Sequence, residues 1–254
     1  MPLSLLILVA AIQGLTEFLP VSSSGHLVLI PIVTDFAYQG RVIDVAAHVG
    51  TLVAVAIYLR IEIIAIAAAL IRFGRNDAVN ARLGIMLILA TIPVIIAGYI
   101  VNYANWHWLD MVYSLAFANL IFAVILWFSD KAPATRRDLG QIGLPHALII
   151  GIVQICALIP GASRSGVTMS AARFLGYDRV TAARFSLLLS LPTIAGAGLL
   201  KTLDLVKSGD ATLGADAIIV AVLSAGLAWL AIRWMMRWFA TAGFGIFVYY
   251  RLAL

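Results

Sequence analysis

Two short polar segments interrupt apolar stretches of the chain, and their residue types could perform chemistry together. The segment from Gln13 reads QGLTEFLPVSSSGH, and the segment from Gln154 reads QICALIPGASRSGV. At an offset of 141 residues they share one Gln, two Ser and one Gly, in the pairs Gln13 and Gln154, Ser22 and Ser163, Ser24 and Ser165, and Gly25 and Gly166. Unpaired polar groups in such surroundings cost roughly several kcal/mol, so we expect these side chains to have a function.

The first segment combines a carboxylate, hydroxyl groups and an imidazole. Gln13 and Glu17 are in i, i+4 positions and therefore share one face of a helix. After the break at Pro20 come Ser22, Ser23, Ser24, Gly25 and His26. This set can supply a nucleophile with its base, or a proton relay. The alternatives are that Glu17 is a structural counter-ion for Arg164 and that His26 is a hydrogen-bonded helix cap.

The second segment has the composition of an anion-binding loop. Gly161 and Gly166 let a backbone approach a ligand closely, and the helix that follows would direct free N–H groups at an anion. Further donors come from Ser163, Arg164, Ser165 and Thr168. We therefore predict a phosphate site, to which Ser22 and Ser24 of the first segment also contribute, with a helix cap in the second segment as the alternative. The Gly161-Ala162-Ser163 sequence loosely resembles the nucleophile motif of intramembrane serine proteases, but the fixed cation of Arg164 favours an anionic substrate.

The composition indicates a helical integral membrane protein. Of the 254 residues, 63% are hydrophobic and 11% are charged, and the mean hydropathy is +1.04. A soluble domain is typically about half apolar and about a quarter charged. The single cysteine, Cys156, excludes a disulfide framework and a cysteine-based metal site. The net charge of +5 indicates basic cytoplasmic loops. The sequence has no basic patch interleaved with aromatic residues, so it does not indicate nucleic-acid binding.

Six apolar segments are near the roughly 20 residues that a membrane-spanning helix needs. They are Ile43–Leu59, Leu83–Val101, Met111–Phe128, Ala183–Leu200, Ala217–Ile232 and Trp238–Leu254. Two further apolar stretches are broken by Pro, Gly and Ser residues into arms that are mostly too short to span. The arms are Leu3–Phe18 with Leu27–Val33, and Leu144–Ile159 with Val167–Leu175. We interpret each stretch as a re-entrant helical hairpin that enters and leaves on the same face.

The basic residues predict the orientation of this single membrane domain. Most fall on one side, namely Arg60, Arg72, Arg75, Arg82, Lys131, Arg136, Arg137, Arg173, Arg179, Arg184, Arg233 and Arg237. The other side has Arg41, Lys201, Lys207 and Arg251. The rich side is cytoplasmic by the positive-inside rule, which puts the first hairpin on the outer face and the second on the cytoplasmic face. Each half, about 1–130 and about 144–254, is then one hairpin followed by three spans, an inverted-topology repeat.

Two further ionisable residues lie at the outer start of the first predicted span. Asp44 and His48 are also in i, i+4 positions. We interpret them as a hydrogen-bonded pair at the membrane interface, with a relay to the site as the alternative. His107 and His146 lie in loop-like surroundings and are assigned no function.

The two motifs together indicate a family. Gln13-x-x-x-Glu17 with Pro20-Val-Ser-Ser-Ser-Gly-His26, followed by Pro160-Gly-Ala-Ser-Arg-Ser-Gly-Val-Thr168, resembles the undecaprenyl-diphosphate phosphatase family linked to bacitracin resistance. The stretch Asp44-Val-Ala-Ala-His-Val-Gly-Thr51 is also similar, so the resemblance covers nearly the whole chain. The resemblance implies that Glu17 is an acid–base or metal-associated residue, and that Ser23 and His26 belong to the catalytic centre. It also implies that Arg164 binds the diphosphate.

The same resemblance implies a divalent cation, Mg²⁺ or Ca²⁺, as cofactor. Glu17 and Gln13 are then the candidate metal ligands. Gln13 stands where many relatives of this family have a Glu. Its neutral oxygen weakens a metal site made of two carboxylates.

We therefore expect a bacterial inner-membrane phosphatase that removes the terminal phosphate of C55 polyprenyl diphosphate, so that the lipid carrier is recycled for cell-wall synthesis. Ser23 or His26 would attack the phosphorus on the extracytoplasmic side, and Glu17 would manage the proton. The expected partners are the lipid substrate and membrane lipids, with no nucleic acid, and a homodimer is compatible with the sequence. The alternative function is a transporter or flippase for a polyprenyl phosphate, because broken helices that meet at mid-depth are also transporter architecture.

Overall fold

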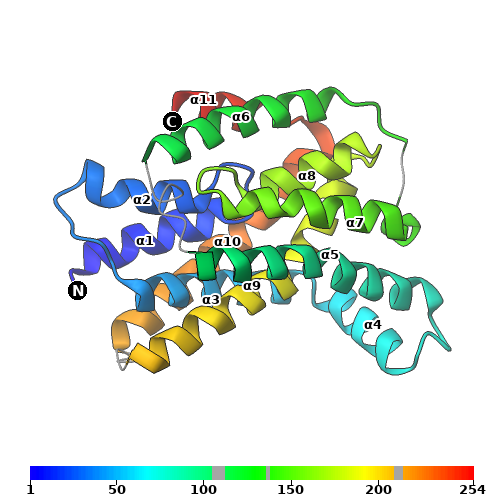
Figure 1. Cartoon of the computed structure of the whole chain (residues 1–254), viewed down its shortest axis with the longest axis horizontal. Helices are drawn as coiled ribbons and strands as arrows, with labels where there is room; N and C mark the ends of the chain where they lie inside the picture. The colour runs from blue at the N-terminus through cyan, green and yellow to red at the C-terminus, as the bar shows by residue number, and fades with distance from the viewer. Residues whose placement is uncertain (105–111, 136–137, 209–213) are drawn as a thin grey trace.

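The computed structural model describes residues 1–104, 112–135, 138–208 and 214–254, and the regular elements in these residues are all helices (Figure 1). The expected all-α class is therefore confirmed. In chain order the helices are α1 (Leu3–Thr16), α2 (Ser23–Val33), α3 (Arg41–Tyr58), α4 (Arg60–Ile71), α5 (Ala78–Ala104), α6 (Val112–Lys131), η2 (Leu139–Gln141), α7 (Leu144–Val153), η3 (Gln154–Leu158), α8 (Arg164–Phe174), α9 (Arg179–Ser208), α10 (Ala215–Thr241) and α11 (Gly245–Ala253).

Five helices of the described chain are long and apolar enough to cross a membrane, namely α3, α5, α6, α9 and α10. They contain the first five predicted spans, apart from Leu59, which is the C-cap of α3, and Met111, which lies outside the described residues. Their surfaces expose large apolar side chains, for example Phe117 at 65% and Val222 at 64%. Lipid chains stabilise such a surface and water does not. The chain is therefore a multi-pass membrane protein.

The predicted sixth span, Trp238–Leu254, is wrong. Its first residues complete α10, and a turn separates them from the nine residues of α11. Two hydrogen bonds hold the turn: Trp238 Nε1 donates to Gly243 O at 3.0 Å, and Phe244 N–H donates to Asp130 Oδ2 at 2.9 Å. At about 1.5 Å per residue, α11 is roughly 14 Å long, about half the thickness of a bilayer core. Hydropathy could not locate a turn that depends on Asp130 of α6.

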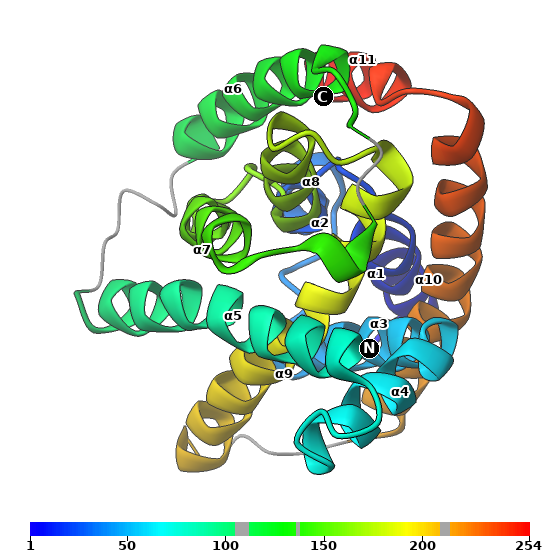
Figure 2. The same cartoon turned by 90° about the vertical axis from the view of Figure 1, so that its right-hand side faces the viewer.

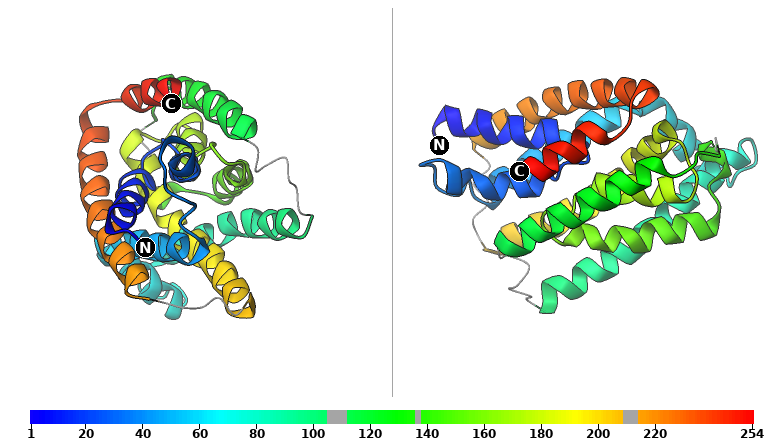
Figure 3. Two further views of the ribbon diagram at one scale, coloured as in Figure 1. Left: turned by 90° about the vertical axis from the view of Figure 1, so that its left-hand side faces the viewer. Right: turned by 90° about the horizontal axis from the view of Figure 1, so that it is seen from above.

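Each of the two broken apolar stretches forms a pair of short helices. α1 and α2 are joined by a break at residues 17–22, and η3 and α8 by a break at residues 159–163. Figure 1 shows the α1–α2 pair and the α7–α8 pair coming from opposite ends of the molecule, so that their breaks meet near its middle. Figure 2 shows long helices, among them α5, α6 and α10, around these pairs, and Figure 3 shows the same enclosure from the other end. The breaks are thus surrounded by protein, as irregular backbone within a membrane requires.

The long helices contact the short pairs in a reciprocal pattern. α1 packs on α10, α7 packs on α5, and α3 packs on α9. Glycine allows the closest contacts between backbones. A Cβ on Gly50 of α3 would overlap the carbonyl oxygen of Ala221, and a Cβ on Gly151 of α7 would overlap that of Ala90. Membrane helices associate through such small residues, and here they join α3 to α10 and α7 to α5.

Candidate active site

Both breaks end in the same backbone turn. Ser22 precedes α2 with a φ of 70°, and Ser163 precedes α8 with a φ of 71°. Each serine caps its helix: Ser22 Oγ accepts from the Gly25 N–H at 3.4 Å, and Ser163 Oγ accepts from the Gly166 N–H at 3.2 Å. Hydroxyl oxygens are also paired in both copies, at 3.3 Å between Ser22 and Ser24 and at 3.1 Å between Ser163 and Ser165. The sequence offset therefore relates two structurally equivalent turns.

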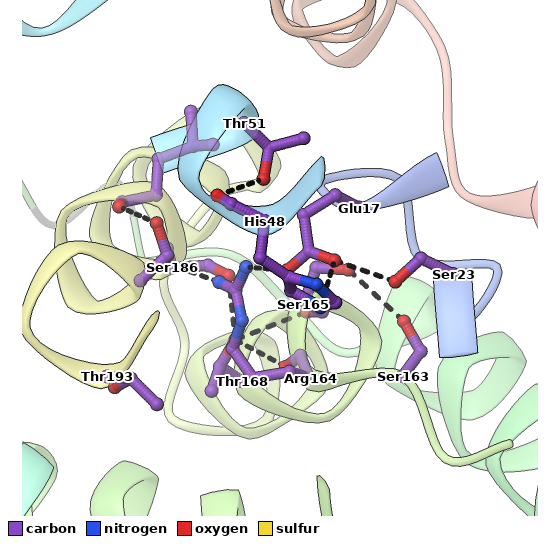
Figure 4. Close-up of polar contacts among 12 residues, drawn as sticks. Glu17, Ser23, His48, Thr51, Ser163, Arg164, Ser165, Thr168, Ser186 and Thr193 are labelled. Atoms are coloured by element: carbon purple, nitrogen blue, oxygen red, sulfur yellow. Dashed lines mark hydrogen bonds and ion pairs between the residues drawn. The ribbon is translucent and has the colours of Figure 1, made fainter. Parts of the chain in front are cut away.

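Glu17 connects the first break to the second. Its side chain is almost buried at the end of α1, and Oε2 accepts from Gln13 Nε2 at 2.8 Å and from Ser23 Oγ at 2.7 Å. Its Oε1 accepts from Arg164 Nη2 at 3.1 Å. Figure 4 shows this carboxylate between Ser23, at the start of α2, and Arg164, at the start of α8. The counter-ion role offered for Glu17 by the sequence is present, and it coexists with the bond to a candidate nucleophile.

A cavity of about 210 Å³ lies between the two breaks. One part of its lining is Glu17, Ser22, Ser23, Ser24, His48, Ser163 and Arg164, and the other is Val45, Ala157, Thr193, Ile194, Ala197 and Gly198. Because α2 begins at Ser23 and α8 begins at Arg164, two helix N-termini meet at this cavity. Helix N-termini favour anions through their free N–H groups and their dipoles. The lining therefore suits a ligand with an anionic head and a hydrocarbon tail.

The second break is fixed against both the first break and α9. Arg164 Nη1 donates to Ser186 O at 3.1 Å, and the Thr168 hydroxyl lies 2.7 Å from the Ser186 hydroxyl. Ser165 Oγ donates to Leu19 O in the first break at 2.8 Å. Ser165 and Thr168 thus position the second break, and they are not among the cavity residues of the described chain. Their predicted contact with phosphate stays a prediction.

The glycines that the sequence assigned to phosphate binding have structural contacts here. Gly161 has a φ of 92°, and a Cβ at this position would overlap the carbonyl oxygen of Leu115 in α6. Gly166 donates its N–H to the capping hydroxyl of Ser163. The second break therefore needs both glycines for its turn and its packing. A direct contact of either with phosphate stays a prediction.

His26 has its contacts on α2 and α11 and is not among the cavity residues. Its Nδ1 lies 2.7 Å from Ser22 O, and its Nε2 lies 2.6 Å from the Tyr250 hydroxyl. Since a carbonyl oxygen only accepts, Nδ1 carries the proton in the first of these bonds. The alternative interpretation of His26, a hydrogen-bonded residue at a helix cap, describes these contacts. A catalytic role for His26 stays a prediction.

His48 is the histidine that lines the cavity. Its Nε2 lies 4.0 Å from Glu17 Oε2, and its Nδ1 lies 2.7 Å from the Asp44 backbone carbonyl. The Asp44 carboxylate instead accepts from the Tyr38 hydroxyl at 2.6 Å and from Gln39 Nε2 at 2.7 Å. Asp44 and His48 are thus hydrogen-bonded as expected, though through the Asp44 carbonyl. The relay interpretation also gains support, because His48 faces Glu17.

Sequence reasoning missed Thr193 as a cavity residue and offered His48 only as the alternative relay to the site. Both belong to predicted spans, where hydropathy averages over all helix faces. The available signals were local. His48 lies one turn before the buried Thr51, and Thr193 follows Pro192, which interrupts the hydrogen bonding of α9. Neither signal says which neighbouring element the side chain will face.

Arg251 of α11 is fully buried and connects both breaks. It donates to Pro20 O in the first break at 3.4 Å, and to Gly161 O and Ala162 O in the second at 2.8 and 3.2 Å. Asn119 of α6 accepts the remaining hydrogen bonds of the guanidinium, and its Nδ2 donates to the Arg251 backbone carbonyl. The expectation that Arg251 is one of the basic residues on the outer side is therefore wrong. The side chain is enclosed because the carbonyl groups of the breaks lack helical partners and need a donor.

The residues around Glu17 do not fit a divalent cation held by the protein alone. Within the described ranges, no group of three or more His, Cys, Asp or Glu side chains is placed to hold a metal ion. Both Glu17 oxygens accept hydrogen bonds, and a guanidinium lies 3.1 Å away. Mg²⁺ needs about six oxygen ligands and Ca²⁺ about six to eight. A single committed carboxylate does not provide such a set.

Comparisons with known proteins cover both breaks and the helices around them. The family model described as bacitracin resistance protein BacA matches residues 6–254. A relative from Dinoroseobacter shibae, named undecaprenyl-diphosphatase, is 45% identical over 252 residues, which is 98% of this chain and 94% of the relative. Relatives with the same name from Ruegeria pomeroyi and Alteromonas mediterranea are 44% and 41% identical, again over 98% of this chain and 94% of each relative.

Proposed function

The chain belongs to the bacitracin resistance protein BacA family, and from this premise we propose that it removes the terminal phosphate of undecaprenyl diphosphate. The product is undecaprenyl monophosphate, so the reaction returns a lipid carrier for cell-wall synthesis. The cavity supports this substrate because polar residues and two helix N-termini face a lining that contains Val45, Ile194 and Ala197.

One observation carries the proposal: Ser23 Oγ donates to Glu17 Oε2 at 2.7 Å in a cavity that Arg164 also lines. A hydroxyl paired with a carboxylate has a base for its proton. Ser23 Oγ attacks the terminal phosphorus, and Glu17 takes the hydroxyl proton. A bond forms between Oγ and phosphorus as the bond to the bridging oxygen breaks. Undecaprenyl monophosphate leaves with the proton from Glu17.

Water completes the reaction at the same two side chains. Glu17, again a carboxylate, takes a proton from water as the water oxygen attacks the phosphorus of the phosphoserine. The bond between phosphorus and Ser23 Oγ breaks, and Oγ receives the proton from Glu17. Inorganic phosphate leaves, and both side chains return to their starting states.

Arg164 and the two helix N-termini stabilise the charge that develops on the phosphoryl oxygens. In the structure, Arg164 Nη2 donates to Glu17 Oε1 at 3.1 Å. A diphosphate oxygen competes for this donor, because charge-assisted bonds from guanidinium to phosphate are strong. Substrate binding therefore weakens the ion pair and leaves Glu17 a better proton acceptor.

We assign the attack to Ser23 rather than to His26. Ser23 lines the cavity and contacts Glu17, whereas the ring nitrogens of His26 bond to Ser22 O and to the Tyr250 hydroxyl. His26 is then a positioning residue, because it holds the carbonyl of the serine that caps α2. Its loss would alter the turn from which Ser23 projects.

The proposed topology has two re-entrant hairpins in an inverted repeat, about 1–130 and about 144–254. Opposite entry of the two helix pairs and the reciprocal packing of α1 on α10 and α7 on α5 support it. The bias of basic residues supports a cytoplasmic end at the α4–α5 turn, although Arg136 and Arg137 lie outside the described residues. The site would then open to the extracytoplasmic side of the bacterial inner membrane. A homodimer stays a prediction.

Phosphate release from undecaprenyl diphosphate by the purified protein in detergent tests the function. We expect turnover by the unaltered protein, and a loss of at least about 10³-fold in kcat for Ser23→Ala, because the nucleophile is removed. Ser190→Ala is the matched control. Its hydroxyl donates to Leu187 O within α9 and is not among the cavity residues, so kcat should not change.

Detergent also separates this proposal from the transport alternative. Transport needs two sealed compartments, whereas hydrolysis does not. A folded, lipid-binding protein that releases no phosphate under any tested cation would overturn the phosphatase proposal. Turnover by Ser23→Ala at the unaltered rate would overturn the role of Ser23 alone.

A further inference from the structure

Glu17 is the only carboxylate among the described residues that line the cavity. Its Oε2 accepts hydrogen bonds from Gln13 at 2.8 Å and from Ser23 at 2.7 Å. Its Oε1 accepts from Arg164 at 3.1 Å. A metal ion bound at Oε2 would have to displace the hydroxyl for which this oxygen is the base. Both carboxylate oxygens therefore already accept hydrogen bonds from protein side chains.

Arg164 also opposes a second cation beside Glu17. Its guanidinium is a permanent positive charge 3.1 Å from one carboxylate oxygen. Like charges at such separations repel each other strongly when little water is present. A divalent cation that arrives without the diphosphate would thus meet a single carboxylate whose charge Arg164 already neutralises.

Gln13 does not add an oxygen to the cavity. Its Oε1 lacks a hydrogen-bond partner among the described residues, but its side chain is 0% exposed and does not line the cavity. The equivalent residue of the other copy, Gln154, is also 0% exposed and also has an unpartnered Oε1. An unpartnered amide oxygen is therefore common to both copies and does not mark a metal site beside Glu17.

We propose that any divalent cation used in this reaction enters with the diphosphate, and that the protein has no resident cation site at Gln13 and Glu17. The substrate is then a complex of Mg²⁺ or Ca²⁺ with the lipid diphosphate. Phosphate oxygens supply most of the ligands, as Mg²⁺ commonly requires. The free cation and the complex differ in net charge. Because the complex is still anionic or nearly neutral, it can lie beside Arg164, whereas the free cation is repelled. This inference rests on the proposed phosphatase function.

The test is calorimetric titration of Ca²⁺ alone into the full chain in detergent, without lipid substrate. We expect no saturable binding below roughly 1 mM, the weak limit for protein Ca²⁺ sites. Gln13→Glu creates two carboxylates in i, i+4 positions, so Ca²⁺ should bind this variant at least about tenfold more tightly. Gln154→Glu is the matched control, because Gln154 is the equivalent buried residue but bonds to the Thr193 hydroxyl and not to Glu17, so this variant should not gain binding.

The unaltered protein alone can overturn the inference, even if Gln13→Glu does not fold. Saturable, stoichiometric Ca²⁺ binding that Glu17→Gln abolishes would show a resident site. A second readout is the Mg²⁺ concentration for half-maximal phosphate release. It should equal the Mg²⁺ affinity of undecaprenyl diphosphate measured in protein-free micelles, and a clearly tighter value would contradict the proposal.

Failure of the phosphatase function gives a different result. In that case no phosphate is released at any Mg²⁺ concentration, whatever the calorimetry shows. A protein that hydrolyses the lipid and also binds Ca²⁺ alone at Glu17 keeps its function and loses only this inference.

Discussion

The two helix breaks share one backbone turn but carry different chemistry. Ser22 and Ser163 have nearly the same φ, 70° and 71°, and each caps an 11-residue helix. At the next position the copies differ: Ser23 begins α2, and Arg164, at the same offset of 141, begins α8. A candidate nucleophile and its complementary cation therefore occupy equivalent positions. The repeated turn thus gives both copies the same backbone geometry, while the residue that follows it determines the chemistry of each copy.

The breaks also differ in how firmly the rest of the protein holds them. The second break and the start of α8 are buried at Ser163, Ser165 and Thr168, and they have bonds to α9 and to the first break. At the start of α2, after the first break, Ser23 is partly exposed and Ser24 is exposed, so both are accessible from the cavity. We infer that the second copy is the fixed charge-binding half, against which the reacting hydroxyl of the first copy is aligned.

Removing the charge that joins the two copies should have the largest effect on stability. Glu17 and Arg164 have side chains only 8% and 12% exposed, so Arg164→Gln leaves a nearly buried carboxylate without its partner. We expect the free energy of unfolding to fall by about 3–5 kcal/mol. We expect kcat/KM to fall by at least about 10²-fold, because the phosphoryl charge loses its stabilising cation. Denaturant unfolding in detergent and phosphate release measure the two effects.

A double substitution separates these effects. Glu17→Gln with Arg164→Gln removes both charges, so its stability should exceed that of Arg164→Gln while activity stays lost. Arg184→Gln is the control, because its ion pair with Glu62 joins side chains that are 40% and 32% exposed, and its loss should cost less than about 1 kcal/mol. A double variant no more stable than Arg164→Gln would contradict the direct coupling of the two copies.

The two breaks also show which features of the fold and the site can be predicted from the sequence. The motifs predicted the short helices and the meeting of Glu17 with Arg164, and the apolar segments predicted the five long helices together with a sixth span that is wrong. Residue type and composition carry that information. The positions of His48, Arg251 and the α10–α11 turn could not be predicted, since each depends on a contact with another element. Arg251 was expected at the outer side, yet its hydrogen-bond acceptors are carbonyls that only the folded chain brings together.

Arg251→Met should weaken both breaks together, with a smaller effect than the first substitution. Carbonyl oxygens of Pro20, Gly161 and Ala162 would lose a buried donor. Unsatisfied buried acceptors cost about 1–3 kcal/mol each, and partial rearrangement reduces the sum, so we expect a loss of about 2–4 kcal/mol in the free energy of unfolding. Hydrogen exchange measured by mass spectrometry should accelerate in residues of both breaks.

Arg233→Met is the matched control for Arg251→Met, because Arg233 is an exposed residue of α10. Its exchange pattern and stability should stay near those of the unaltered protein. Faster exchange in only one break of Arg251→Met would mean that Arg251 stabilises that copy alone. This result would contradict the role of Arg251 in holding both breaks.

The helix caps provide the smallest and most direct test of equivalence. Ser22→Ala and Ser163→Ala each remove a capping hydroxyl while keeping a side chain at positive φ, so each should lower the free energy of unfolding by about 1 kcal/mol. Ser22→Gly and Ser163→Gly remove the same hydroxyl but relieve the strain of that backbone conformation, so their losses should be smaller than those of the alanine variants. Thermal unfolding of the four variants in one detergent compares their stabilities.

If the alanine and glycine variants rank in the same order and differ by similar amounts at both positions, the two turns are energetically equivalent. Their difference in chemistry then lies with Ser23 and Arg164. A large loss at one position with none at the other would mean that only one copy depends on its cap.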